Sequence, residues 1–301
     1  MNASLRSTPL LVLITLSAFA SNSILCRLAL VPDLVDPGTF TVLRLASGAL
    51  MLVFLLRLRK DRTWKQPHWG AAVALGGYAA LFSYSYVTIP VGVGAFVLFA
   101  AVQITMIGWD ISRGRRVTGY EWSGLVLAVS GLAILTLPGS AAADVSGVAF
   151  MAAAGICWGV YSILGKGSRN PLGNTGSNFV FAVLLVWPLL VFSPVGEAKP
   201  GGVFLAVSSG ALASGLGYVL WYALLPRISA TQAAILQMLV PVLAAGGGVL
   251  FLNEFLDIRM VLAGTAILSG IFIAVVLPAY RNLETASVAT DSLQGRGKTR
   301  S

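Results

Sequence analysis

Long apolar runs separated by short polar breaks occupy almost the whole chain. A transmembrane helix needs about 20 consecutive apolar residues, because the hydrocarbon core of a bilayer is about 30 Å thick. Ten runs of roughly that length are present, at residues 10–30, 40–56, 69–89, 92–111, 122–137, 145–165, 178–192, 203–225, 230–252 and 260–276, the second, fifth and seventh being short. The pattern predicts an all-α membrane protein with ten transmembrane helices.

The most distinctive stretch covers residues 218–248, where two apolar runs flank a short break at 226–229. It is typical of a tight membrane hairpin. Its second run contains Pro241, which removes a backbone donor and kinks a helix. Hydrocarbon tolerates such a kink only where neighbouring helices or a water-filled cavity satisfy the freed carbonyl. We therefore expect this hairpin to border a cavity, and the three glycines at 246–248 to form a flexible or gate-forming segment.

Composition and charge sharpen this prediction. A chain that is 57% hydrophobic and only 10% charged has too little polar surface for a soluble domain. The net charge of +9 could suggest a nucleic-acid partner, but its distribution indicates otherwise. If the N-terminus is cytoplasmic, 16 of the 20 basic residues lie on the cytoplasmic side and only Lys199 and Arg259 lie on the outer side. The remaining two, Arg27 and Arg44, lie within spans. This positive-inside asymmetry predicts a membrane protein with both termini cytoplasmic and no nucleic-acid partner.

The N-terminal run has a second interpretation. Arg6, an apolar run and the sequence Ala18-Phe19-Ala20 resemble a cleavable signal peptide. Cleavage would leave nine spans and would spoil both the charge balance and the internal repeat described next. We therefore expect this run to remain as the first span.

The two halves of the sequence resemble each other. Superposing Gly77 on Gly215 brings Gln103 onto Pro241, and the order of spans and short loops agrees over two halves of five spans each. Because five is odd, the second half must insert upside down, which is the inverted-repeat architecture of secondary transporters, with the substrate site near the membrane midplane between the halves. The predicted segments are a cytoplasmic N-terminus at 1–9, repeats at 10–137 and 145–278, a periplasmic linker at 138–144 and a disordered cytoplasmic tail at 279–301.

Polar and aromatic residues near the middle of a span are the candidates for binding a substrate in the central cavity. A buried glutamine is unfavourable in lipid unless it meets a partner or water, so both midspan glutamines should face inward. The candidates are Asn22, Tyr78, Tyr84 and Gln103 from the first half and Trp158, Tyr161, Tyr218, Trp221, Tyr222 and Gln237 from the second.

Arg27 and Arg44 are cations within spans, and such residues are functional candidates by default. Each lies near the outer end of its span, however, where its head can reach the interface. Asp33 and Asp36 are available there as counter-charges. The sequence therefore favours a structural role for both arginines, with Arg44 the better candidate for binding substrate.

Little in the sequence indicates an enzyme or a channel. The single histidine, His68, is in a predicted loop, and no metalloprotease, serine-hydrolase or phosphate-binding motif occurs. We expect no cofactor and no metal. A channel remains an alternative, but the chain lacks a filter-like repeat or a ring of charges.

The acidic residues bear on energy coupling. Each of the 11 acids falls in a loop, a tail or the edge of a span. Proton relays through membranes normally use intramembrane Asp, Glu or His. The sequence therefore predicts a facilitator, with Glu254 as the one acid that could couple transport to protons if its helix were longer.

Several of these stretches resemble one family. SNSILCRLAL in the first span, GICWGVYSILGK in the sixth, SGLAIL in the fifth and the hairpin that ends before Glu254 are similar to the drug/metabolite transporter superfamily, and more narrowly to its EamA-type bacterial members. Tyr78 and the pattern from Cys157-Trp158 to Tyr161 resemble the YddG-type aromatic amino-acid exporters. The sequence departs from the family at Gln103, where members usually carry proline.

The resemblance implies a ten-helix carrier of the bacterial cell inner membrane, with a central cavity, that exports amino acids or related metabolites by alternating access. Aromatic faces and neutral polar groups in the candidate site favour amino acids with apolar or aromatic side chains. Sugar phosphates are the alternative, and they would require an inward-facing cation that no span midpoint supplies. The expected partners are a small-molecule substrate and the lipid bilayer, with the chain acting as a monomer.

Overall fold

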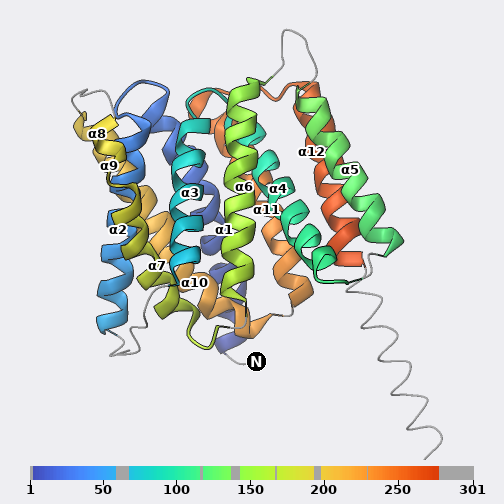
Figure 1. The fold of residues 1–301 in the computed structure, drawn as a ribbon, viewed down its shortest axis with the longest axis horizontal. Helices are drawn as coiled ribbons and strands as arrows, with labels where there is room; N and C mark the ends of the chain where they lie inside the picture. Colours follow the sequence, from blue (N-terminus) through green and yellow to red (C-terminus); the bar gives the residue numbers. More distant parts are fainter. Residues whose placement is uncertain are drawn as a thin grey trace, which may run out of the picture.

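The computed structural model describes residues 3–58, 68–115, 118–136, 143–166, 168–192, 198–228 and 230–277, and these are helical throughout apart from short connections (Figure 1). The predicted tail at 279–301 lies outside the described residues, as do residues 1–2 and 138–142. The first repeat contains α1 (Ala3–Leu30), α2 (Pro37–Leu58), α3 (Trp69–Ser85), α4 (Val91–Ser112) and α5 (Gly119–Thr136). The second contains α6 (Val145–Gly165), α7 (Pro171–Val186), α8 (Leu189–Phe192), α9 (Pro200–Ser208), the π-helical η1 (Ser209–Leu216), α10 (Gly217–Leu224), η2 (Leu225–Arg227), α11 (Ala230–Leu252), α12 (Ile258–Ile271) and η3 (Phe272–Val276).

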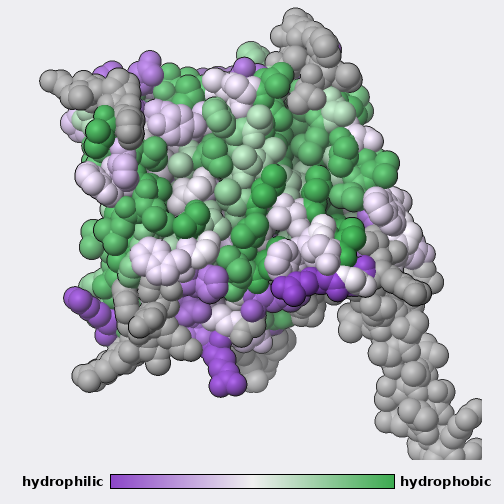
Figure 2. Space-filling view, viewed as in Figure 1, coloured by the Kyte–Doolittle hydropathy of each residue, from purple (hydrophilic) through white to green (hydrophobic). Residues whose placement is uncertain are grey.

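The helices have the length and composition of membrane spans. Eight helical segments of the described chain are long and apolar enough to cross a bilayer, and Gly119–Leu135 is a shorter apolar helix. The tenth predicted span is α3, which has 17 residues and contains adjacent glycines and a tyrosine. Apolar side chains cover most of the visible face, and hydrophilic ones gather at its lower end (Figure 2). The prediction of an all-α membrane protein is confirmed.

The prediction for the seventh span needs correction. It begins at Pro171, earlier than expected, because Asn170 caps the helix by accepting a bond from the Gly173 amide (2.9 Å) and proline is favoured in the first turn. It also stops at Val186 and resumes at Leu189, because Pro188 cannot donate a backbone hydrogen bond within a helix.

Contacts at one end of the bundle show that the repeats are inverted. Arg27, in the last turn of α1, donates to the carbonyl of Tyr86 directly after α3 (2.9 Å). Ser85, at the end of α3, donates to the carbonyl of Gly147 at the start of α6 (2.6 Å). The first helix of the second repeat therefore begins at the end of the bundle where the first helix of the first repeat finishes.

The fifth helices of the two repeats form a pair at one edge of the molecule (Figure 1). There α5 packs against α12 and η3. The remaining spans enclose the centre of the bundle, where α1 contacts α11, α2 contacts η1 and α7, and α6 contacts both α3 and α4. The centre is thus built from helices of both repeats.

Polar residues at the helix ends fix where the spans begin. Asp36 accepts a bond from the Thr39 amide at the start of α2 (2.9 Å). Asp144 accepts bonds from the Gly147 amide (2.7 Å) and from Thr88 (2.9 Å) at the start of α6. A bond from the Ser146 hydroxyl, followed by the bonds from the Gly147 amide and Thr88, lowers the pKa of Asp144 because these bonds favour its charged form.

A close approach between α2 and η1 brings the middle of α2 to the centre of the bundle. A Cβ atom added at Gly210 would overlap the carbonyl oxygen of Arg44 and the hydroxyl of Ser47. Glycine is therefore required there, because small residues allow the backbones of membrane helices to approach closely. The crossing places the side chain of Arg44 between the two repeats.

We expect Gly210→Ala to lower the free energy of unfolding by about 1–3 kcal/mol, because overpacking a tight contact costs that much. Thermal unfolding of the purified protein in detergent measures the effect. Gly246→Ala is the matched control, since in the described structure a Cβ built there meets no heavy atom within 4 Å other than the nearby backbone of its own helix. Equal stability changes in the two variants would contradict the close approach.

Candidate substrate cavity

A cavity of about 120 Å³ lies at the centre of the bundle. Its lining comes from the first four spans of each repeat, while α5 and α12 contribute nothing to it. A single water needs only about 10–15 Å³ by this measure, so the cavity has room for a small organic molecule. Its position between inverted repeats agrees with the midplane site expected of a secondary transporter.

One wall of the cavity is aromatic, and Trp158 stands at its middle. The Trp158 ring on α6 lies 4.8 Å from the ring of Tyr78 on α3 and 5.9 Å from that of Tyr218 on α10, centroid to centroid. Phe179 on α7 and Phe19 on α1 each approach the Tyr218 ring to 5.9 Å. Five helices therefore contribute rings to one surface, which can hold an apolar or aromatic group.

Neutral polar groups supply the rest of the specific chemistry. The side-chain oxygen of Asn22 accepts bonds from Ser209 (2.9 Å) and Ser214 (3.0 Å), tying α1 to η1 beside the cavity. Gln103 on α4 and Gln237 on α11 line it from the other side. Within the described ranges no group of three or more His, Cys, Asp or Glu residues could hold a metal ion.

Arg44 brings a charge into this site, contrary to the expectation that it reaches the interface. It is only 3% exposed and lines the cavity. Its Nη2 donates to the hydroxyl of Tyr78 (3.2 Å), and its guanidinium lies 4.7 Å from the centre of the Phe82 ring. Because η1 holds the middle of α2 at the centre of the bundle, Arg44 cannot extend to the membrane surface. A cation buried this way loses its hydration, which is costly unless an anion approaches it.

Most of the residues predicted from sequence meet at the cavity. Eight of them line it, namely Asn22, Arg44, Tyr78, Gln103, Trp158, Tyr218, Trp221 and Gln237. Tyr161 and Tyr222 lie behind the aromatic wall, where Thr175 accepts a bond from the Tyr161 hydroxyl (3.4 Å) and lies 3.0 Å from that of Tyr222. Tyr84 is 36% exposed and does not belong to the lining, so its prediction as a site residue is wrong.

Other lining residues escaped the sequence analysis. They include Phe19, Ser23, Phe82, Phe99, Phe179 and Ser214. Phe82 could have been found, because it lies one helical turn from Tyr78 and so shares its face. The isolated phenylalanines carry no comparable signal, because phenylalanine is also favourable on the lipid-facing side of a helix.

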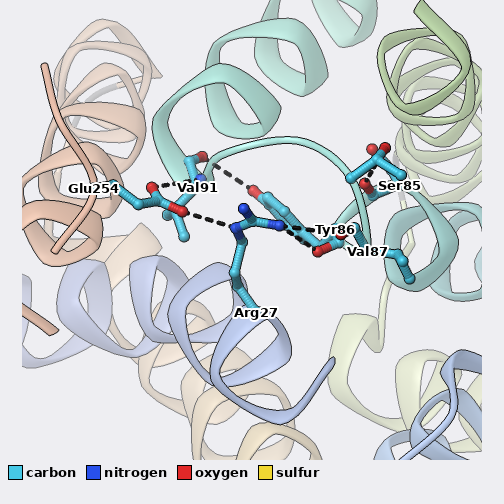
Figure 3. Close-up of polar contacts among 7 residues, drawn as sticks. Arg27, Ser85, Tyr86, Val87, Val91 and Glu254 are labelled. Carbon is cyan, nitrogen blue, oxygen red and sulfur yellow. Dashed lines mark hydrogen bonds and ion pairs between the residues drawn. The ribbon is translucent and has the colours of Figure 1, made fainter. Parts of the chain in front are cut away.

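An ion pair joins separate segments at one end of the bundle (Figure 3). The Nε of Arg27 lies 2.7 Å from Oε1 of Glu254, and both side chains are mostly buried. The second oxygen of Glu254 accepts a bond from the Val91 amide at the start of α4 (2.8 Å). Nη1 of Arg27 bonds the carbonyl of Tyr86 (2.9 Å). We call these four residues the Arg27–Glu254 latch, because they join the ends of α1 and α11 to the connection between α3 and α4.

Local structure directs Glu254 toward the latch. Asn253 adopts a left-handed backbone (φ 54°) that ends α11 and turns the chain back, and the Glu254 amide bonds the carbonyl of Gly248 (3.1 Å). A Cβ at Gly248 would approach the Glu254 carboxylate to 2.5 Å, so the glycine leaves room for it. The expectation that Asp33 and Asp36 serve as counter-charges is corrected for Arg27, because its partner is Glu254.

A second ion-pair group lies at the opposite end of the bundle. Arg115, after α4, contacts Glu121 (2.6 Å) at the start of α5 and Asp110 (3.1 Å) near the end of α4. The Arg115 side chain is 41% exposed, so solvent screens these pairs. They join neighbouring segments of the first repeat only.

Residues 6–137 and 145–276 each match the EamA-like transporter family. The chain belongs to this family. It is therefore a multi-pass membrane transporter of the drug/metabolite transporter superfamily. The two matches follow the two halves of the bundle, and the family is one of transporters.

Two relatives and one solved structure extend the comparison. The chain is 45% identical over 271 residues to an uncharacterized protein of Pseudomonas aeruginosa, covering 88% of this chain and 93% of that one. It is 31% identical over 287 residues to the threonine/homoserine exporter RhtA of Escherichia coli K12, covering 90% and 93%. A solved crystal structure superposes with a TM-score of 0.62 at 19% identity over 88% of this chain and 98% of that one, which supports the fold alone.

Proposed function

We propose that this transporter exports amino acids from the cytoplasm across the bacterial inner membrane, including ones with apolar or aromatic side chains. The observation that carries the proposal is the cavity between the repeats, with its aromatic wall and its neutral amide and hydroxyl groups. Relatives with about 30% identity that are named threonine/homoserine exporters support the amino-acid class. The aromatic wall supports larger apolar side chains in addition.

Transport by alternating access requires each end of the cavity to close in turn. The Arg27–Glu254 latch is suited to holding one end shut, because it joins three segments that are far apart in sequence and come from both repeats. In our proposal the latch opens when substrate leaves. In this proposal the latch is at the periplasmic end and both termini are in the cytoplasm, an orientation supported by the excess of basic residues on the predicted cytoplasmic side.

A flux assay in proteoliposomes tests the substrate class. We expect saturable uptake and counterflow of at least one of L-phenylalanine, L-leucine, L-threonine and L-homoserine, and no uptake of glucose 6-phosphate. Protein-free liposomes give the background. Uptake of the phosphorylated sugar without any amino-acid transport would overturn the proposal.

The same vesicles test energy coupling. The cavity lining contains no Asp, Glu or His, so we expect flux to follow the substrate gradient and an imposed pH gradient to leave it unchanged. Accumulation of substrate against its gradient, driven by pH and abolished by Glu254→Gln, would contradict the facilitator prediction.

Sugar phosphates remain the second candidate because of Arg44. These substrates require an inward-facing cation, and the prediction from sequence that none is available is wrong, since Arg44 lines the cavity. The total charge of the cavity lining distinguishes amino acids from sugar phosphates.

A further inference from the structure

Arg44 is a buried cation without a counter-ion. Among the described residues its Nη1 has no hydrogen-bond partner, whereas Arg27 and Arg115 each form an ion pair with a carboxylate. Its other contacts are the Tyr78 hydroxyl and the faces of the Tyr78 and Phe82 rings. Ring faces attract a cation, but they do not accept the hydrogen bonds that a guanidinium offers through five N–H groups. An arginine also remains charged when buried. The missing partner is therefore an anion.

The lining of the cavity limits how much negative charge that anion can carry. Arg44 is the one charged residue among the side chains that line it in the described structure. A carboxylate carries one negative charge and matches the planar fork of a guanidinium. A phosphate monoester carries close to two charges at neutral pH and would need a further cation.

We infer that Arg44 binds a single carboxylate of the transported molecule. This inference rests on the proposed function and adds the chemical group that the cavity recognises. Burial makes the contact selective, because a molecule without a carboxylate leaves the guanidinium unpaired.

The same lining predicts what the cavity does not require. No carboxylate lines it in the described part of the chain, so the ammonium group of an amino acid meets only neutral amide and hydroxyl oxygens and ring faces. Gln103, Gln237 and the Trp158 ring are available for this purpose. Recognition therefore depends more on the carboxylate than on the ammonium. A 2-hydroxy acid with the same side chain should bind, whereas the amide of the amino acid should not.

The test measures binding to the purified transporter by isothermal titration, with L-phenylalanine, L-phenylalaninamide, 3-phenyllactate and inorganic phosphate as ligands. We expect the amide to bind at least tenfold more weakly than the amino acid, and phenyllactate to bind within about threefold of it. Arg44→Gln should reduce the ratio of acid to amide affinity to near one, and Arg44→Lys should retain part of it. Arg113→Gln is the matched control, because Arg113 also stacks on an aromatic ring, that of Trp109, but lies outside the cavity.

The outcomes separate this inference from the proposed function. Equal binding of acid and amide to the unsubstituted protein, or an unchanged ratio in Arg44→Gln, would overturn the role of Arg44 while amino-acid flux still supported export. Binding of phosphate that depends on Arg44, without binding of either acid, would overturn both. If Arg44→Gln fails to fold, the ratio in the unsubstituted protein and in Arg44→Lys decides.

Discussion

Glu254→Gln is expected to increase the rate at which Cys26 reacts with a water-soluble thiol reagent by about 30-fold. Cys26 precedes Arg27 on α1 and is fully buried. Its thiol lies beside Ser83 at the end of α3, and the same latch joins α1 to the connection after α3, so we expect opening of the latch to expose the thiol. Its thiol therefore reports directly on whether the Arg27–Glu254 latch is closed.

The size of the effect follows from the contacts that the carboxylate makes. Glu254 accepts one bond from Arg27 at 2.7 Å and one from the Val91 amide at 2.8 Å. The amide side chain of glutamine carries no charge, and only one of its two terminal atoms can accept. Hydrogen bonds to charged groups contribute about 1.5–3 kcal/mol each, and partial exposure of this pair favours the lower part of that range. A loss of about 2 kcal/mol changes the ratio of open to closed states about 30-fold.

The measurement uses the Cys157→Ser background, so that Cys26 is the single thiol. Glu121→Gln is the matched control, because Glu121 forms an ion pair with Arg115 of similar length at the other end of the bundle. We expect Glu121→Gln to leave the reactivity of Cys26 unchanged. Equal rates in Glu254→Gln and its parent, or equal increases in both variants, would show that the latch does not hold the end closed.

Trp158→Ala is expected to raise the substrate concentration that gives half-maximal flux by about 30-fold or more. Buried aromatic residues at the centre of a binding site contribute about 2 kcal/mol or more when truncated, and each 1.4 kcal/mol is a factor of ten. Trp158 lies within 6 Å of three tyrosine rings, from Tyr78, Tyr161 and Tyr218. Its removal takes away ring surface and also frees its neighbours to move into the cavity.

A folding control is needed, because truncating a tryptophan also removes packing. Phe150→Ala makes a similar reduction on the same helix, α6, at a side chain that is 42% exposed and does not line the cavity. Size-exclusion profiles and unfolding temperatures in detergent establish that both variants fold. If folded Trp158→Ala and Phe150→Ala reach half-maximal flux at the same substrate concentration, Trp158 does not belong to the binding site.

The sequence alone determined the class of fold and its internal symmetry. Apolar runs of the length of a bilayer are a local property, and so are the breaks at Pro226 and around His68 that separate spans. The odd number of spans in each half then required inversion, which the contact of Ser85 with Gly147 confirms. Midspan polar residues were also good candidates, because a buried amide such as Gln103 must face a cavity or a partner.

Only the tertiary structure decided which face of each span is turned inward. A membrane helix is apolar on its lipid side as well as its core side, so periodicity does not separate Tyr84, which faces outward, from Tyr78, which lines the cavity. Pairing was equally hidden. Arg27 and Glu254 are 227 residues apart in the chain. Asp33 and Asp36 lie much closer to Arg27 in sequence, so they were the expected partners. Arg44 reaches the cavity because Gly210 lets η1 press against α2, a contact between two repeats that no local pattern encodes.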